Sequence, residues 1–211
     1  DLMKQNYQIM LEQTIKKLQK EEKRPSLLLH SCCGPCSSYV MEYLAQHFDI
    51  TILYYNPNIA PESEFTFRAE EQKRLIDEMG LGVKYQLGKY DPERFFELAK
   101  GHEDEPEGGE RCFKCYRLRL EEAARIAKEG AFDYFTTTLS ISPHKNAQVL
   151  NELGKEIGET FGVPYLFSDF KKKNGYRRSC ELSVEYNLYR QDYCGCPFSK
   201  AEAEARKAAQ S

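Results

Sequence analysis

SLLLHSCCGPCSSYVMEYLAQH, residues 26–47, is the stretch that decides the fold. Its apolar start, residues 26–29, predicts a short strand, and the residues from Pro35 to His47 predict a helix. The loop between them carries Cys32, Cys33 and Cys36. A strand that leads through a short loop into a helix is the building unit of α/β proteins.

The same unit recurs along the chain. Further strands are predicted at residues 50–55, 83–87, 134–139 and 164–167. Helices are predicted at residues 2–20, 62–79, 92–100, 112–129 and 146–161. Such alternation implies right-handed crossovers and parallel pairing. We therefore expect an α/β fold with an open, mainly parallel five-stranded sheet and helices on both faces.

Length and composition fit a single α/β domain over residues 1–211. The chain is 41% hydrophobic and has no linker rich in Pro, Ser or Gly. No apolar run approaches the roughly 18 residues that a membrane span needs. Residues 1–24 are too charged for the apolar part of a secretory signal. We expect a cytoplasmic protein with no membrane partner.

Eight cysteines are too many for structural disulfides in that reducing compartment. They form three groups and one single residue: Cys32, Cys33 and Cys36; Cys112 and Cys115; Cys194 and Cys196; and Cys180. A buried single cysteine is an ordinary small hydrophobic residue, which is our interpretation of Cys180. Three clusters are not a core pattern, and they indicate a metal or redox site.

Two of the cysteine groups are predicted to meet at one edge of the sheet. Cys32 and Cys33 follow the first strand, and Cys112 and Cys115 open a helix that descends from the same edge. Four thiolates suit either a closed zinc site or an iron-sulfur cluster. The adjacent cysteines splay their sulfur atoms apart, which favours the wider cluster over a single ion.

The pair Cys194-Gly195-Cys196 needs a separate explanation. A disulfide between them closes a small strained ring, and strained disulfides are the more oxidising ones. It can store two electrons beside a one-electron cluster; alternatively, one or both cysteines bind metal. A helix over 178–190 that packed downward would carry the pair to the wrong edge, so we expect that segment to lie across the site.

The tetrapeptide Cys33-Gly34-Pro35-Cys36 resembles the thioredoxin redox site, but that interpretation leaves six cysteines unexplained. Two alternative functions stay open at this point. A thiol-disulfide oxidoreductase using this motif would need no iron, and a zinc-stabilised binding protein would need no electrons.

Several motifs in order resemble the QueH family of epoxyqueuosine reductases: LLLHSCCGPCSS, YYNPNI, CFKC, TTTLSISPHKN and DYCGCPFS. The likeness covers nearly all of the chain after about Pro25. It implies an adenine nucleotide alpha-hydrolase-like fold without ATP, because HSCCGPCSS replaces the phosphate loop. It also implies the last step of queuosine biosynthesis, in which the epoxide on a modified wobble base of tRNA is reduced to an alkene and its oxygen leaves as water.

The resemblance also implies the cofactor. By analogy, Cys32, Cys33, Cys112 and Cys115 hold a [4Fe-4S] cluster, and Cys194 and Cys196 form a redox-active pair. The spare ligands for a second, mononuclear iron are Cys36, Cys194, Cys196 and Asp192. Candidate proton donors are His30, His144 and Tyr193. The sequence does not identify the electron donor.

A net charge of −3 is unusual for a tRNA-binding protein, but the positive charges are clustered. The run KKKNGYRR contributes Lys171, Lys172, Lys173, Arg177 and Arg178. The CxxC pair is surrounded by Arg111, Lys114, Arg117 and Arg119. Such patches engage phosphates whatever the overall charge. We expect a splayed anticodon base to stack on one of three tyrosines, Tyr54, Tyr55 or Tyr176.

Overall fold

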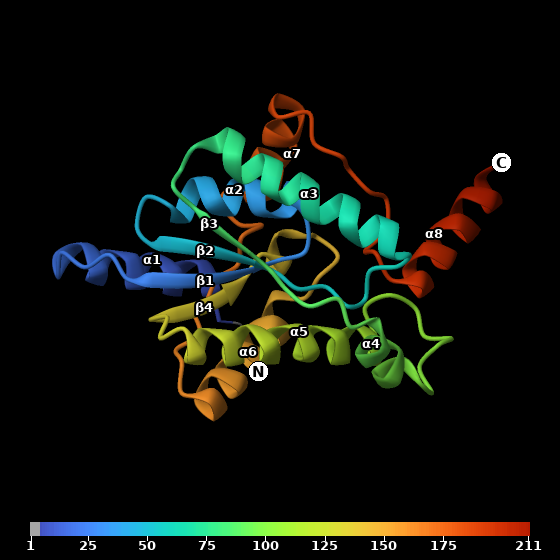
Figure 1. The fold of residues 1–211 in the computed structure, drawn as a ribbon, viewed down its shortest axis with the longest axis horizontal. Coiled ribbons are helices and arrows are strands. Elements are labelled where there is room, and N and C mark those ends of the chain that lie inside the picture. The colour runs from blue at the N-terminus through green and yellow to red at the C-terminus, as the bar shows by residue number, and fades with distance from the viewer. Residues whose placement is uncertain (1–4) are drawn as a thin grey trace.

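The computed structural model describes residues 5–211 and contains one parallel sheet (Figure 1). Its strands are β1 (Ser26–Ser31), β2 (Asp49–Tyr54), β3 (Lys84–Leu87) and β4 (Tyr134–Thr137), in the order β3-β2-β1-β4. All three pairings are parallel, and Leu28 of β1 lies opposite Thr51 of β2 and Phe135 of β4. The predicted α/β class and parallel pairing are confirmed.

The predicted fifth strand is wrong. Residues 164–167 make a single isolated bridge between Tyr165 and Phe135, so the sheet in the described residues has four strands. The Phe135 amide donates to the Pro164 carbonyl at 3.1 Å, and Leu166 donates back to Phe135 at 2.9 Å. Pro164 has no N–H to extend the ladder. β4 also ends earlier than predicted, because a 3₁₀ turn, η1 (Leu139–Ile141), follows it.

Helices cover both faces of the sheet (Figure 1). One face carries α1 (Tyr7–Lys20), α2 (Gly34–Leu44), α3 (Glu62–Met79) and α7 (Gly175–Glu185). The other face carries α5 (Glu110–Glu129) and α6 (Ala147–Phe161), with α4 (Pro92–Ala99) beside α5 and α8 (Pro197–Gln210) beyond the sheet edge. The first residues of the predicted helix over 2–20 lie outside the described residues.

Side chains of β1 alternate between the two cores, as a strand buried on both faces requires. Leu27 and Leu29 pack with α1, α2 and α3, whereas Leu28 packs with α5 and α6. All three leucines are fully buried. This packing fixes the end of β1, and therefore the cysteine loop that follows it, at the centre of the sheet edge.

The segment before the C-terminal cysteines borders the site, as expected, but only part of it is helical. Its helix α7 packs alongside α2, where Arg178 pairs with Glu42 at 2.8 Å, and Ser179, Ser183 and Arg190 border the site. The helix ends at Glu185, and Asn187 adopts a left-handed φ of 49°. A non-helical stretch then runs back toward α8 and returns Cys194 and Cys196 to the sheet edge (Figure 1).

Within residues 5–211, we find no helix whose length and apolar character would let it cross a bilayer.

Candidate metal and redox site

The site lies at the carboxyl end of β1, where the strand order changes direction. β1 is flanked by β2 on one side and β4 on the other, which is where open α/β sheets form their ligand crevice. The loop there is held by hydrogen bonds between buried side chains and backbone. The Ser31 hydroxyl donates to Gln72 Oε1 at 2.5 Å, and Asn56 Nδ2 donates to the Ser31 carbonyl at 2.9 Å.

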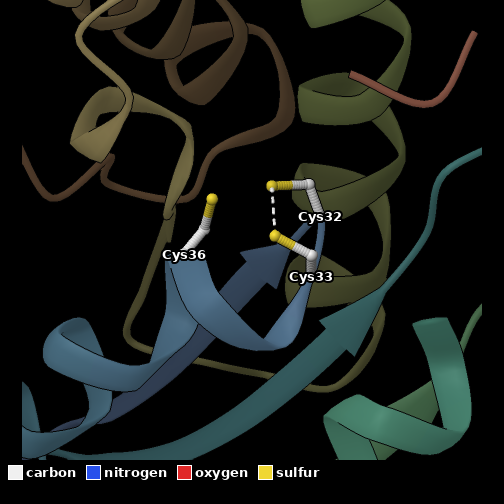
Figure 2. A group of neighbouring side chains, drawn as sticks. All are labelled: Cys32, Cys33 and Cys36. Carbon is white, nitrogen blue, oxygen red and sulfur yellow. Dashed lines mark hydrogen bonds between the residues drawn. The ribbon is translucent and has the colours of Figure 1, made fainter. Parts of the chain in front are cut away.

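Three thiols of this loop point toward one another (Figure 2). The sulfur atoms of Cys32, Cys33 and Cys36 all lie within 4.8 Å of one another, and the Cys32 thiol donates to Cys33 at 3.8 Å. Hydrogen bonds from Cys32 and Cys36 lower the pKa of Cys33 well below its usual range. Hydrogen bonds with Cys32 and Cys33 raise the pKa of Cys36 well above its usual range. Three converging sulfur atoms, one of them readily ionised, are suited to binding a metal.

A second cysteine group lies around the start of α5. Cys112 and Cys115 occupy its first turns, and burial raises the pKa of Cys115 to about 12. Cys194 and Cys196 line the same small space as this pair, and Cys196 caps α8 by accepting from the Ser199 amide at 3.2 Å. Cys112 and Cys115 are outside the three-thiol group, which is the one set of three or more close ligands in the described chain.

Two cavities meet between the cysteine groups. The outer cavity, of about 590 Å³, is bordered by Cys32, Cys33, Cys36 and Cys194. The inner cavity, of about 10 Å³, is bordered by Cys112, Cys115, Cys194 and Cys196. Four residues line both cavities: Glu107, Lys145, Cys194 and Ser199. Cys194 is thus the cysteine that links the two groups.

Two cations lie among the thiols. The Arg119 side chain is 1% exposed, and its nitrogens donate to the Cys115 carbonyl at 3.4 Å and to Asn56 Oδ1 at 3.3 Å. Lys145 Nζ lies 3.6 Å from Cys194 Sγ. Neither cation has a carboxylate within 4.0 Å in residues 5–211. Burial opposes their charge, but the surrounding thiolates outweigh it and raise the pKa of both groups.

Of the three candidate proton donors, His30 lines neither cavity and is held within the sheet. It is fully buried; its Nε2 donates to the Tyr55 carbonyl at 2.9 Å, and its Nδ1 lies 2.8 Å from the Thr137 hydroxyl. Burial lowers its pKa to about 4, so it is a neutral structural residue. The other two candidates, His144 and Tyr193, both line the outer cavity.

Asp192 also lines the outer cavity, but it already has a partner. Its carboxylate forms an ion pair with Lys207 of α8, and this hydrogen bond lowers the pKa of Asp192. Tyr54 and Tyr55 are fully buried and are not accessible for stacking a base, whereas Tyr176 is 41% exposed and lines the cavity.

Most of the predicted basic run is paired with carboxylates. Lys171 pairs with Asp169 at 3.1 Å, and Arg178 pairs with Glu42; longer contacts join Arg177 to Glu181 at 3.9 Å and Lys173 to Glu12 at 4.0 Å. Lys172 is exposed and has no carboxylate within 4.0 Å among the described residues. The run is therefore a weaker anion-binding surface than its sequence predicts.

Of the four basic residues named beside the CxxC pair, Arg111 lies differently from expectation, whereas Lys114 lies at the surface as expected. Arg111 is 1% exposed, and its Nη1 donates to the carbonyls of His102 at 3.0 Å and Glu105 at 2.6 Å. Burial makes Arg111 a structural residue that cannot reach a phosphate. Lys114 lies at the surface with Nζ 2.8 Å from His102 Nε2.

Sequence reasoning missed Lys145 and Glu107. Lys145 follows His144 in the motif TTTLSISPHKN, and only the histidine was considered as a donor there. Glu107 lies in the acidic loop before α5, where no site residue was predicted. A signal existed for both, because each lies in a loop expected at the same sheet edge as the cysteines.

The fold and the two cysteine groups define an α/β protein with a thiol-rich metal or redox site at the carboxyl edge of a parallel sheet. The sequence profile of epoxyqueuosine reductase QueH matches residues 27–202. The chain therefore belongs to the QueH family of epoxyqueuosine reductases, which confirms the resemblance seen in the motifs.

Curated relatives support this membership over most of the chain. Epoxyqueuosine reductase QueH of Staphylococcus epidermidis is 46% identical, over 92% of this chain and 84% of the relative. The Streptococcus pyogenes protein is 44% identical, over 92% and 78%. The Thermotoga maritima protein is 35% identical, over 87% and 94%. NMN synthetase from Francisella tularensis aligns over 97% of this chain and 92% of its own, with 11% identity and a TM-score of 0.37.

Proposed function

We propose that this protein is an epoxyqueuosine reductase that acts on the wobble base of tRNA. It reduces the epoxide of the cyclopentane ring to an alkene, and the oxygen leaves as water. The observation that carries the proposal is one cavity of about 590 Å³ in which the thiols of the β1–α2 loop meet Cys194. That volume is in the range of sites for small molecules, and it suits a modified nucleoside that has left its stack.

An iron-sulfur cluster is the cofactor that we propose, and the two cysteine groups that border adjoining cavities support it. We assign Cys32, Cys33, Cys112 and Cys115 as its ligands, with Arg119 and Lys145 beside them. A buried cation without a carboxylate is costly, and thiolate ligands supply the negative charge that these two lack. Of the four spare ligands for a second, mononuclear iron, Cys36, Cys194 and Asp192 line the outer cavity, whereas Cys196 lines only the inner one.

The redox balance assigns a role to Cys194 and Cys196. Opening the epoxide to an alkene and water consumes two electrons and two protons. Oxidation of two thiols to a disulfide releases two electrons and two protons, so one turnover of the pair matches one turnover of substrate. A bound cluster supplies single-electron transfer between the pair and an external donor. Since Cys194 lines both cavities, it is the member of the pair that faces the substrate.

Lys145 is our candidate for the group that faces the leaving oxygen. An epoxide oxygen leaves more readily when a donor takes up its developing negative charge. Lys145 lines the outer cavity beside Cys194, and its ammonium group carries N–H donors. His30 does not line this cavity, and its Nε2 is already bonded to the Tyr55 carbonyl. We propose that Lys145 donates a hydrogen bond, and then a proton, to this oxygen.

The tRNA is proposed to approach on the α7 side of the outer cavity. Tyr176, Ser179 and Ser183 of α7 line the cavity there, and Arg190 follows them along the chain. Tyr176 offers a half-exposed ring for stacking, and Lys172 offers an unpaired charge for a phosphate. These residues would hold the anticodon loop while the wobble base enters the cavity.

The test is anaerobic purification followed by iron and sulfide analysis, a visible spectrum, and incubation with epoxyqueuosine tRNA and a chemical reductant. We expect a thiolate-to-iron absorption band and a nucleoside lighter by one oxygen atom. Stoichiometric zinc without conversion would support a zinc-stabilised tRNA-binding protein. A metal-free protein that only exchanges disulfides would support a thiol-disulfide oxidoreductase.

A further inference from the structure

The acidic loop between α4 and α5 sends one carboxylate to the site. Glu107 lines both the outer and the inner cavity, together with Lys145 and Cys194. Its position is fixed from α8, because its backbone amide donates to Glu202 Oε2 at 3.0 Å. On the other side, the Gly108 amide donates to Cys112 Sγ at 3.2 Å. Glu107 is therefore held at the junction of the two cysteine groups.

This carboxylate has no cationic partner. Within residues 5–211, no Lys, Arg or His nitrogen lies within 4.0 Å of it, although the half-buried side chain shares the cavity walls with several cations. The other carboxylate that lines the outer cavity, Asp192, is paired with Lys207. Glu107 is thus the one unpaired carboxylate that lines this cavity in the described chain.

A second acceptor without a donor lies beside it. Asn58 is 1% exposed, lines the inner cavity with Glu107, and has an Oδ1 that is buried without a hydrogen-bond partner. Its Nδ2 lies 3.9 Å from Cys194 Sγ, which orients the amide toward the redox pair. The inner cavity has room for about one water-sized group. A carboxylate and an amide oxygen that both lack donors suit a small cation with N–H groups.

The substrate of the proposed function carries such a group. In epoxyqueuosine a secondary amine joins the 7-deazaguanine base to the cyclopentane ring, on the carbon next to the epoxide. When protonated, this amine has one positive charge and two N–H donors. We propose that Glu107, assisted by Asn58, binds this ammonium group and is a specificity-determining residue of the site. The inference rests on the proposed function and adds the part of the substrate that is recognised.

The position of Glu107 also orients the reaction. The amine and the epoxide are attached to neighbouring ring carbons, so an amine held at Glu107 places the epoxide beside the other residues that line both cavities. Those include Cys194, which faces the substrate, and Lys145, which donates to the oxygen. Of the cations of the inner wall, Lys145 lies beside the Cys194 thiol and Arg119 donates to the Cys115 carbonyl. Arg111 donates through Nη1 to the carbonyls of His102 and Glu105, and its buried Nη2 has no hydrogen-bond partner among the described residues. Glu107 is the one carboxylate among the inner-wall residues described.

The experiment compares holoenzyme with Glu107→Gln and with the control Asp104→Asn, an exposed residue of the same loop that lines neither cavity. Binding is measured for tRNA with guanine, 7-aminomethyl-7-deazaguanine or epoxyqueuosine at the wobble position. Wild type should prefer both amine-bearing tRNAs. Glu107→Gln should lose about 10- to 100-fold of that preference, the effect of one hydrogen bond to a charged group. Asp104→Asn should keep it.

The sign of the effect separates recognition from general charge. Removing any negative charge tightens binding of all tRNAs alike, which is the change expected for Asp104→Asn. In turnover, Glu107→Gln should raise KM by a similar factor with a much smaller change in kcat and unchanged iron content.

A retained preference for amine-bearing tRNA in Glu107→Gln would overturn the proposal. So would a loss of iron or thermal stability without a change in preference, because Glu107 would then be a counter-ion of the inner wall. If wild type reduced no epoxyqueuosine, the proposed function would fail, whereas the binding comparison would still test Glu107.

Discussion

Replacing Lys145 by methionine removes one charge from the site while keeping most of the side-chain volume. Lys145 Nζ lies 3.6 Å from Cys194 Sγ. If the developing charge on the leaving oxygen lies about as far from Nζ as this sulfur does, two unit charges attract by about 4 to 5 kcal/mol at an effective dielectric constant of about 20. Desolvation of the ammonium group offsets part of this attraction. We expect a net loss of about 2 to 3 kcal/mol in transition-state stabilisation, which is roughly a 30- to 150-fold fall in rate.

The assay is anaerobic single turnover of epoxyqueuosine tRNA, followed by nucleoside mass spectrometry. We expect Lys145→Met to lower the rate of the chemical step with little change in tRNA affinity or iron content. Lys145→Arg keeps the charge and should recover part of the rate. The matched control is His144→Gln, the neighbouring exposed residue on the cavity rim, which should stay within about threefold of wild type.

Two results would refute this reasoning. A Lys145→Met enzyme that turns over like wild type would show that no positive charge is needed at the leaving oxygen. A large loss in His144→Gln with normal turnover in Lys145→Met would move the donor to the rim of the cavity.

Three further predictions follow from the placement of the other site residues. The proposed cluster ligands are Cys32, Cys33, Cys112 and Cys115, and replacing any one of them by alanine should abolish cluster assembly, as measured by iron and sulfide content. A variant that keeps full iron would show that its residue is not a ligand. Cys180→Ser should leave iron content and turnover largely intact, because Cys180 lines neither cavity; collapse of both would contradict this. Charge reversal of Lys172 and Arg177 should weaken tRNA binding and flatten the dependence of log K on log salt by roughly 0.7 to 0.9 per lost contact. Arg178→Glu should instead lower thermal stability by breaking its pair with Glu42, and an unchanged salt slope in the first variant would make the run a solvated loop.

The sequence predicted the part of the fold that local patterns determine. The strand at β1, the cysteine loop and the start of α2 were readable because an apolar run, a Gly-Pro turn and a helical period follow one another within one unit. The parallel order followed from alternation of strands and helices. The prediction of a fifth strand at residues 164–167 was wrong, because a short apolar run has the same sequence pattern whether or not its backbone pairs with a neighbouring strand.

The site was less predictable, because burial and ion pairing depend on distant residues. Glu42 and Asp169 neutralise Arg178 and Lys171, and no spacing rule shows such pairing. Arg111 looks like a surface cation in CFKC's neighbourhood, yet the acidic loop folds over it. The cysteine clusters were visible in the sequence, with Cys36 grouped with Cys32 and Cys33. Only the structure shows that the sulfur atoms of these three converge and that Cys112 and Cys115 lie outside their group.

The turn at Gly195 explains how one short motif serves both cavities. Gly195 has a φ of 126°, and a Cβ there would lie 2.7 Å from Ile59 and 3.0 Å from Arg68 Nη1, so only glycine fits. Arg68, which is 1% exposed, donates to the Cys194 carbonyl at 3.0 Å, and the Ala60 amide donates to the Gly195 carbonyl at 3.0 Å. The turn therefore holds Cys194 where it lines both cavities, whereas Cys196 lines only the inner cavity and caps α8. In the proposed reaction, this turn would place Cys194 on the substrate side and Cys196 on the inner side of the redox pair, and the buried Arg68 would hold the Cys194 backbone in that position.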